Sequence, residues 1–169
     1  MNRNLQALNA LPRQYAEAAL LACCGSRNWA RRMADARPFQ EIAQLLETAD
    51  RTWRELPADD WREAFRQHPK IGQKPSAADS TQASVWSETE QSGTRGASAE
   101  TRAALAEANR EYLALFGYIF IVCATGKTAE EMLALLRQRL QNDAHVELHI
   151  AAGEQQRITE LRLRKFLAE

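Results

Sequence analysis

The stretch FQEIAQLLETADRTW, residues 39–53, decides the fold class of this chain. Its apolar side chains recur every three or four positions, at Phe39, Ile42, Leu45, Leu46, Ala49 and Trp53. This spacing places them on one face of an α-helix and leaves charged and amide side chains on the opposite face. Arg37-Pro38 before the stretch and Pro57 after it limit the helix. The stretch therefore predicts an amphipathic helix that covers a core.

The same period continues on both sides of this stretch. Pro12 opens a helix that Gly25 ends, and Ser26 caps the next helix, which carries Trp29 and Met33 inward. Further helices are expected around Trp61 and at residues 83–91, 98–116, 128–140 and 144–166. The whole pattern predicts an all-α protein, a single-domain helical bundle of about seven helices over residues 1–169 with irregular loops.

Two segments depart from the helical pattern. Residues 73–81 are rich in Pro, Ser, Asp and Ala without a period, and are expected to form an irregular loop. Residues 118–124, YIFIVCA, are the most apolar part of the chain, and their residue types also suit a buried strand. Because helices are expected on both sides and no partner strand is visible in the sequence, a buried helical turn or extended segment that crosses the core is the preferred interpretation.

Composition limits the partners and the compartment. Lys plus Arg and Asp plus Glu both number 22, so neither nucleic acid nor an anionic membrane is favoured as a partner. No apolar run approaches the roughly 20 residues of a membrane span, and the first residues resemble no signal peptide. The three cysteines suggest buried free thiols rather than disulfides, and the last three residues are not a peroxisomal signal. A cytoplasmic protein is expected.

Two motif-like patterns have simpler interpretations. Gly126-Lys127-Thr128 lacks the first glycine of a phosphate-binding loop, because Ile121 stands at that position. His145 and His149 share a helical face as in metalloprotease motifs, but Glu147 is displaced by one position from the place of a general base. A helix boundary explains the first pattern, and a solvated histidine pair explains the second.

Arg162 and His68 are the side chains whose positions favour a site. Ile158, Leu161 and Phe166 are expected to define the inward stripe of the last helix, and Arg162 adjoins that stripe. An arginine there can bind a carboxylate through two parallel hydrogen bonds. His68 ends a helix before Pro69 and opens a loop, where a side chain can face a cleft.

Several motifs in series carry a family resemblance. They are Cys23-Cys24-x-Ser26-x-x-Trp29, Arg37-Pro38-Phe39, His68-Pro69-Lys70-Ile71-Gly72, Ser87-x-x-Glu90-Gln91, Phe116-Gly117-Tyr118-x-Phe120-Ile121-Val122-Cys123-Ala124 and Leu161-Arg162-Leu163. In order and spacing they resemble the 2-oxo-4-hydroxy-4-carboxy-5-ureidoimidazoline (OHCU) decarboxylases, and the likeness covers nearly the whole chain. Each motif alone is weak, but the series is specific.

The resemblance implies an all-helical, commonly homodimeric carboxy-lyase of urate (purine) degradation that forms (S)-allantoin and needs no cofactor or metal. His68 matches the catalytic proton donor, Glu90 the acidic residue beside it and Arg162 the substrate-binding arginine. Further substrate contacts are implied for Pro69, Ser87, Glu88, Thr89, Gln91, Phe120, Ile121, Val122, Cys123 and Ala124. The last five contribute backbone groups.

Two other functions are compatible with parts of the sequence. A helical interaction module could use the tryptophans and the basic last helix as a partner surface, and would expose an apolar patch. A metal-dependent hydrolase could use His145 and His149, and would bind zinc or iron stoichiometrically.

Overall fold

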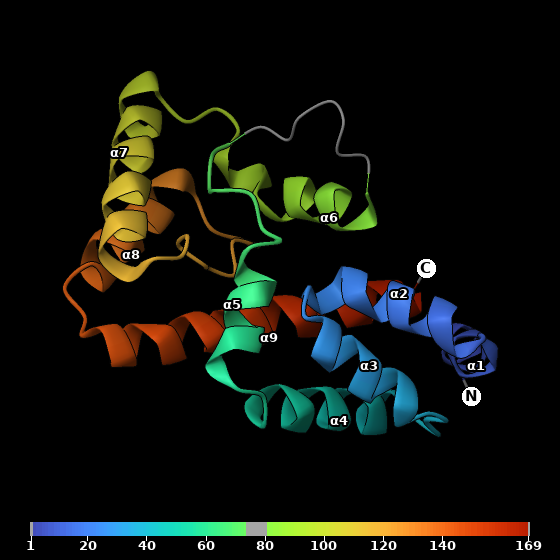
Figure 1. The fold of residues 1–169 in the computed structure, drawn as a ribbon. Coiled ribbons are helices and arrows are strands. Elements are labelled where there is room, and N and C mark those ends of the chain that lie inside the picture. Colours follow the sequence, from blue (N-terminus) through green and yellow to red (C-terminus); the bar gives the residue numbers. More distant parts are fainter. Residues whose placement is uncertain (1, 74–80, 169) are drawn as a thin grey trace. The chain divides into compact units, whose positions relative to one another are not determined.

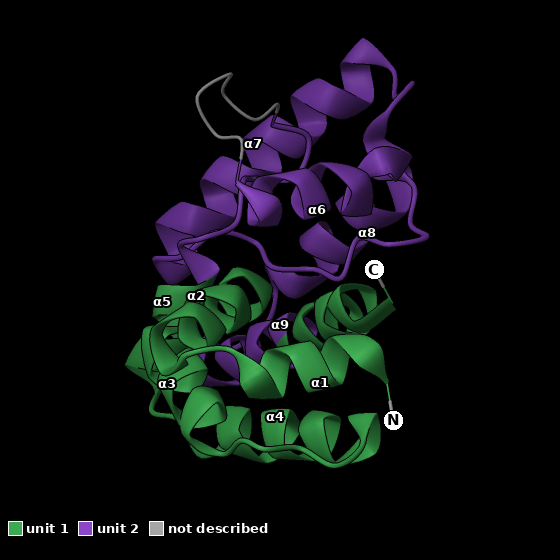
Figure 2. Ribbon diagram, turned by 90° about the vertical axis from the view of Figure 1, so that its right-hand side faces the viewer, with its two compact units in different colours: residues 1–64, 156–169 green, residues 65–155 purple. Residues whose placement is uncertain are grey.

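The computed structural model describes residues 2–73 and 81–168, and these residues form helices joined by turns and irregular segments, without a strand (Figure 1). The helices are α1 (Arg3–Ala10), α2 (Arg13–Cys24), α3 (Arg27–Asp35), α4 (Ile42–Arg54), α5 (Ala58–Phe65), α6 (Gln82–Glu90), α7 (Ala99–Phe116), α8 (Ala129–Arg139) and α9 (Ala144–Ala168), with a short 3-10 helix, η1, at Ser92–Thr94. The chain divides into two compact units, unit 1 with residues 1–64 and 156–169, and unit 2 with residues 65–155 (Figure 2).

Unit 1 is organised around Trp29. Helix α2 ends at Gly25, whose φ of 89° few other residues adopt, and the Ser26 side chain then caps α3 by accepting from the Trp29 amide. The Trp29 side chain is fully buried and donates from Nε1 to the Ala49 carbonyl of α4 at 3.1 Å. A hydrogen bond therefore satisfies the polar atom of this large core side chain, and it joins α3 to α4.

The N-terminal helix of unit 1 is fixed by side chains that bind backbone carbonyls. Arg37 donates to the carbonyls of Leu8 at 2.6 Å and Leu11 at 2.8 Å. Asn9 both donates to and accepts from the Phe39 backbone. These bonds satisfy groups at the end of α1 that have no partner within the helix.

Unit 2 surrounds an apolar segment that is not helical. Helix α7 packs against α8, and it ends at Gly117, whose φ is 79°. Residues 118–124 follow in an irregular buried path, so the expected buried segment is confirmed, whereas neither a helical turn nor a strand forms there. The ring of Tyr112 on α7 lies 5.4 Å from that of Phe120 and 5.9 Å from that of Tyr118. Aromatic packing thus holds the segment against α7.

The all-α prediction is confirmed, and some details are wrong. The described residues contain nine α-helices rather than about seven, and α1 was not expected because it is short and buries Leu5 and Leu8 alone. Leu161 was expected to face inward but is 37% exposed, and Leu163 and Leu167 are buried instead. Residues 74–80, most of the expected irregular loop, lie outside the described residues. The expectation of a single domain stays a prediction.

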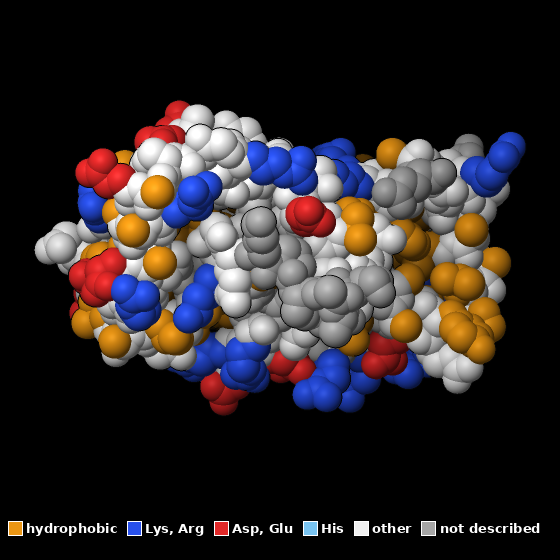
Figure 3. Space-filling model, turned by 90° about the horizontal axis from the view of Figure 1, so that it is seen from above, with side chains coloured by type: hydrophobic (Ala, Val, Ile, Leu, Met, Phe, Trp, Pro, Cys, Tyr) orange, Lys and Arg blue, Asp and Glu red, His pale blue; other side chains and the backbone are white. Residues whose placement is uncertain are grey.

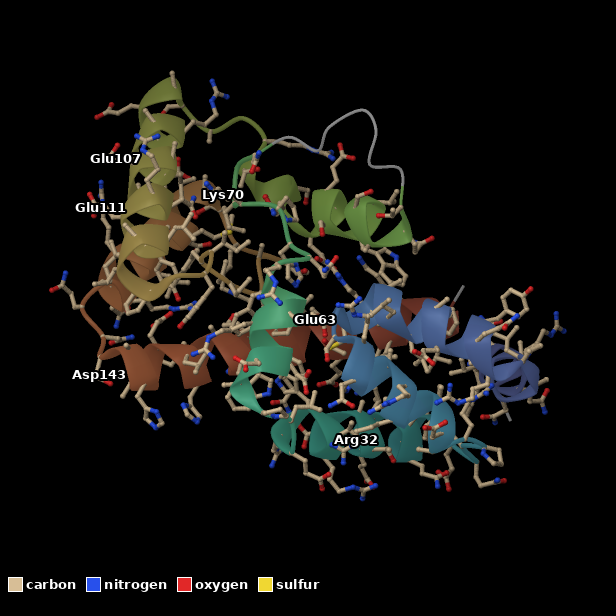
Figure 4. All side chains as sticks on the ribbon, viewed as in Figure 1. Arg32, Glu63, Lys70, Glu107, Glu111 and Asp143 are labelled. Atoms are coloured by element: carbon tan, nitrogen blue, oxygen red, sulfur yellow. The ribbon has the colours of Figure 1, made fainter. Side chains whose placement is uncertain are left out.

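The visible surface carries mixed charges. Figure 3 shows basic, acidic and hydrophobic side chains interspersed on one face, and Figure 4 shows Glu107 and Glu111 pointing outward from α7. No helix within the described part of the chain is long and apolar enough to cross a membrane.

Candidate active site

His68 lies just beyond the end of α5 and is tied to α9. Its amide donates to the Phe65 carbonyl, which turns the chain, and its side chain is half-buried. The His68 Nε2 lies 2.6 Å from Oε1 of Gln155, a fully buried residue of α9. This short contact joins the imidazole to a side chain that is itself held in the core. Gln155 thereby orients the His68 ring.

Helix α6 turns part of the predicted substrate segment inward and part outward. Ser87 and Glu90, three residues apart on one helical face, are 4% and 9% exposed. Glu88 and Thr89 are exposed, and the Thr89 hydroxyl donates to a carbonyl of its own helix. Gln91 accepts from the Gly72 amide at 3.1 Å, so it joins the end of α6 to the loop after His68. That loop also contains Lys70 (Figure 4).

Residues 120–124 are held by side chains that bind their backbone. Glu154 of α9 accepts from the Cys123 amide at 2.7 Å, and Lys127 donates to the Cys123 carbonyl at 2.7 Å. Since Glu154 and Gln155 are adjacent, neighbouring residues of α9 bind this segment and His68. The structure therefore brings His68 and the predicted backbone contacts to the same part of α9.

Glu90 contributes negative charge to the same region. Burial raises the pKa of the Cys123 thiol, and the Glu154 and Glu90 carboxylates raise it further, whereas Lys127 lowers it. Two carboxylates on different helices thus act on one point of the segment. An acid and an imidazole in unit 2 are the groups that general acid–base chemistry requires.

Arg162 belongs to unit 1, where it lies close to two buried thiols. Its side chain is 3% exposed, and it follows Gln155 by seven positions, about two turns along α9. Burial raises the pKa of the Cys23 and Cys24 thiols to about 12, and the positive charge of Arg162 opposes this rise in both. All three cysteines are free and buried, as predicted.

These pKa values predict slow alkylation of the native protein. At pH 8 a thiol of pKa about 12 is ionised to roughly one part in 10⁴, and the thiolate is the reactive form. We expect iodoacetamide to modify Cys23 and Cys24 rapidly only after unfolding in guanidinium, as measured by mass spectrometry. Equal rates in the native and the unfolded protein would contradict the burial of these thiols.

The structure also shows site contacts that the sequence did not reveal. Gln155, Glu154, Arg139 and Glu147 were not expected to take part, because each depends on pairing between distant segments. One signal was present. Glu147, Ala151 and Gln155 are spaced by four positions, so two polar side chains share the apolar face of a long helix, where unpartnered polar groups are costly.

The histidine pair of α9 does not form a metal site with Glu147. His145 and His149 are exposed, and the Nδ1 of His149 lies 2.9 Å from the His145 carbonyl. Glu147 is buried and paired with Arg139. No cluster of three potential metal-binding side chains occurs among the residues described. The predicted helix boundary at residues 126–128 is confirmed, since Thr128 forms a capping box with Glu131.

A separate cavity of about 240 Å³ lies in unit 1 between α4 and α9. It is lined by apolar side chains including Trp53 and Leu163, and by polar ones including Asp50, Glu160 and Arg164. None of the predicted site residues lines it. The cavity is therefore not the predicted site.

In the described part of the chain, adjacent residues of α9 thus bind the His68 imidazole and the irregular segment at residues 120–124. The family model for OHCU decarboxylase matches residues 9–164. The chain belongs to the OHCU decarboxylase family. This confirms the family that the sequence motifs resemble.

Individual relatives agree with this assignment. The uric acid degradation bifunctional protein TTL of Arabidopsis thaliana is 41% identical over 150 residues, which make up 87% of this chain and 46% of that protein. The 2-oxo-4-hydroxy-4-carboxy-5-ureidoimidazoline decarboxylase of Amia calva is 28% identical over 131 residues, or 78% of this chain and 75% of that one. The chain thus spans less than half of its bifunctional relative.

Solved structures share the fold. A crystal structure of OHCU decarboxylase in the presence of (S)-allantoin has a TM-score of 0.78 and 37% identity, covering 94% of this chain and 100% of that chain. A crystal structure of (S)-allantoin synthase has a TM-score of 0.71 at 16% identity, covering 96% and 53% of the two chains. The second likeness shows the fold alone.

Proposed function

We propose that this chain decarboxylates 2-oxo-4-hydroxy-4-carboxy-5-ureidoimidazoline to (S)-allantoin in urate degradation. The observation that carries the proposal is the contact of His68 Nε2 with Gln155 at 2.6 Å, beside the contact of Glu154 with the Cys123 amide at 2.7 Å. Adjacent positions of one helix thereby fix a proton-carrying ring and the backbone segment that matches the family's substrate contacts. Family membership supports the choice of reaction.

The substrate itself contains the group that accepts the electron pair released by decarboxylation. The bond between the ring carbon and the carboxylate breaks, carbon dioxide leaves, and the electron pair passes into the adjacent ring carbon–nitrogen double bond. The hydroxyl on the carbon that lost the carboxylate then gives up its proton to become the ring carbonyl, and a proton added to the neighbouring, ureido-bearing carbon gives allantoin. No cofactor is needed to hold the charge, so the protein has to bind the substrate, orient its carboxylate and protonate one face.

His68 is the proposed proton donor, and its contact with Gln155 is proposed to hold the imidazole in place for the transfer. Glu90 is proposed to set the protonation state of His68 and to crowd the departing carboxylate. One-sided delivery then yields a single enantiomer. The hydrogen bond to Gln155 and the burial of Glu90 support these roles.

The segment that includes Val122 and Ala124 is proposed to bind the ureido arm through its backbone. In the described part of the chain, the amides of these two residues form no hydrogen bond. Inward-facing Ser87, together with Pro69 and Gln91 near the His68 loop, is proposed to line the substrate. Glu88 and Thr89, which we also predicted to touch the substrate, are exposed on α6, and this argues against direct contact.

The rate of carbon dioxide release tests the proposed activity. Urate, urate oxidase and hydroxyisourate hydrolase generate the substrate, which also decays spontaneously. We expect release to become faster in proportion to the concentration of this protein. A rate that equals spontaneous decay at every protein concentration, with the fold confirmed by circular dichroism, would contradict the proposal.

Arg162 is proposed to bind a ring oxygen or the ureido carbonyl of the substrate. We expect Arg162→Lys to raise KM about tenfold with a smaller change in kcat, because an ammonium group cannot make the planar two-point contact. Arg164→Lys is the matched control. Arg164 lies two positions after Arg162 on α9, is exposed, and forms an ion pair with Glu160. A wild-type KM in Arg162→Lys would rule out this role.

A homodimer and a cytoplasmic location complete the proposal. The homodimer rests on the resemblance to OHCU decarboxylases, which are commonly homodimeric. Three free thiols support a reducing compartment.

A further inference from the structure

We propose that Arg139 is a positioning residue, which aims the Val122 amide at the substrate by holding the preceding carbonyl. This inference rests on the proposed function. Arg139 ends α8, is buried, and donates from Nη1 to the Ile121 carbonyl at 2.6 Å. Its guanidinium carbon lies 4.5 Å from the centre of the Phe120 ring. Arg139 thus contacts two consecutive residues, Phe120 and Ile121, of the segment proposed to bind the substrate.

The guanidinium is itself fixed from the opposite side. Glu147 is fully buried, and its Oε1 accepts from Arg139 Nε at 2.7 Å and from the Tyr112 hydroxyl at 2.5 Å. Its Oε2 accepts from the side-chain Nδ2 of Asn142 at 2.9 Å. Helices α7, α8 and α9 therefore supply Tyr112, Arg139 and Glu147 to one network, in which both carboxylate oxygens are satisfied.

Because a peptide unit is planar, the hydrogen bond from Arg139 to the Ile121 carbonyl also sets the direction of the Val122 amide. The Ile121 carbonyl and the Val122 amide belong to one trans peptide, so they point in opposite directions. A carbonyl held toward Arg139 turns the Val122 amide away from the buried network. Lys127 acts similarly on the next peptide but one, because its bond to the Cys123 carbonyl turns the Ala124 amide away from Lys127. Two donors are thereby left for a ligand.

Stability alone does not explain a buried ion pair at this place. Removing two charges from water is costly, and apolar residues of similar volume often stabilise a fold equally well. The planar guanidinium binds a carboxylate and a carbonyl at once in fixed directions, which an ammonium group cannot do. The network is therefore suited to setting the direction of a backbone group.

The test uses a double variant, because Arg139→Met alone would leave Glu147 charged and buried. Arg139→Met combined with Glu147→Gln removes both charges and keeps an amide oxygen for Tyr112. We expect a melting temperature close to that of the wild type, a KM for the enzymatically generated substrate about tenfold higher, and Cys123 amide exchange at least tenfold faster. The matched control is Arg137→Met, which replaces an exposed arginine of the same helix and should leave the melting temperature, KM and Cys123 exchange unchanged.

A folded double variant with wild-type KM and wild-type Cys123 exchange would overturn the inference. A purely structural role would lower the melting temperature and leave KM unchanged, which would also overturn it. A chain that lacks the proposed decarboxylase activity would give a different set of results. In that case the wild type would not accelerate carbon dioxide release, whereas exchange at Cys123 would still separate the double variant from Arg137→Met and show that Arg139 holds the segment.

Discussion

His68→Ala is expected to lower kcat/KM for enzymatic decarboxylation by about 10²- to 10⁴-fold, the range that general acid catalysis typically contributes. The substitution removes the ring whose Nε2 is bound to Gln155, and with it the proposed proton donor. Substrate positioning by residues 120–124 should persist, so residual activity above spontaneous decay is expected. Stopped-flow measurement of carbon dioxide release gives the rate constants.

The control for this prediction is His145→Ala. His145 is exposed, so its loss should leave kcat/KM unchanged. Circular dichroism should show the helicity of the wild type in both variants, because His68 is half-buried and outside a helix. If folded His68→Ala retained wild-type kcat/KM, His68 would not be the proton donor.

Glu90→Gln is expected to lower kcat by about 10²-fold or more. The substitution keeps the size of the side chain and removes the charge, so it separates electrostatics from packing. Without the Glu90 carboxylate, the protonated form of His68 loses a stabilising negative charge. The carboxylate that leaves the substrate is also no longer crowded by a like charge. The pH dependence of kcat should change as well, because Glu90 is proposed to act through the protonation of His68.

Glu88→Gln provides a matched control two positions away on the same helix. Glu88 is exposed and its carboxylate lies 3.8 Å from Arg95, so the substitution removes the same charge from the outer face of α6. We expect wild-type kinetics for this variant. Equal losses in Glu88→Gln and Glu90→Gln would indicate a general effect of net charge and would exclude a local role for Glu90.

Helical periodicity predicted most of the fold because local signals determine most of its elements. The apolar face of α4, the serine cap before Trp29 and the capping box at Thr128 all act within a few turns, although α4 begins at Ile42 and leaves Phe39 outside the helix. Helix α1 was missed because its eight residues bury two leucines, which is too little to give a clear period. Leu161 was wrongly predicted to face inward, because leucines also stand at positions 163 and 167 and the buried face of α9 passes through those two.

The candidate site was less accessible from the sequence. Family motifs identified His68, Glu90 and the segment at 120–124, but the groups that hold them lie far away along the chain. Gln155 is 87 positions from His68, and Arg139 is 18 positions from Ile121. Pairings at such separations arise from the packing of helices, which no local pattern encodes. Buried polar residues in the apolar stripe of α9 were the available sign of them.

The enantiomeric composition of the allantoin formed from urate by urate oxidase, hydroxyisourate hydrolase and this protein is the most direct test of one-sided proton delivery. Chiral chromatography of early time points, before spontaneous decay contributes, gives the ratio of enantiomers. We expect nearly pure (S)-allantoin with the wild type and racemic product both without the protein and with His68→Ala. Racemic allantoin formed at an accelerated rate by the wild type would contradict delivery from a single face by His68.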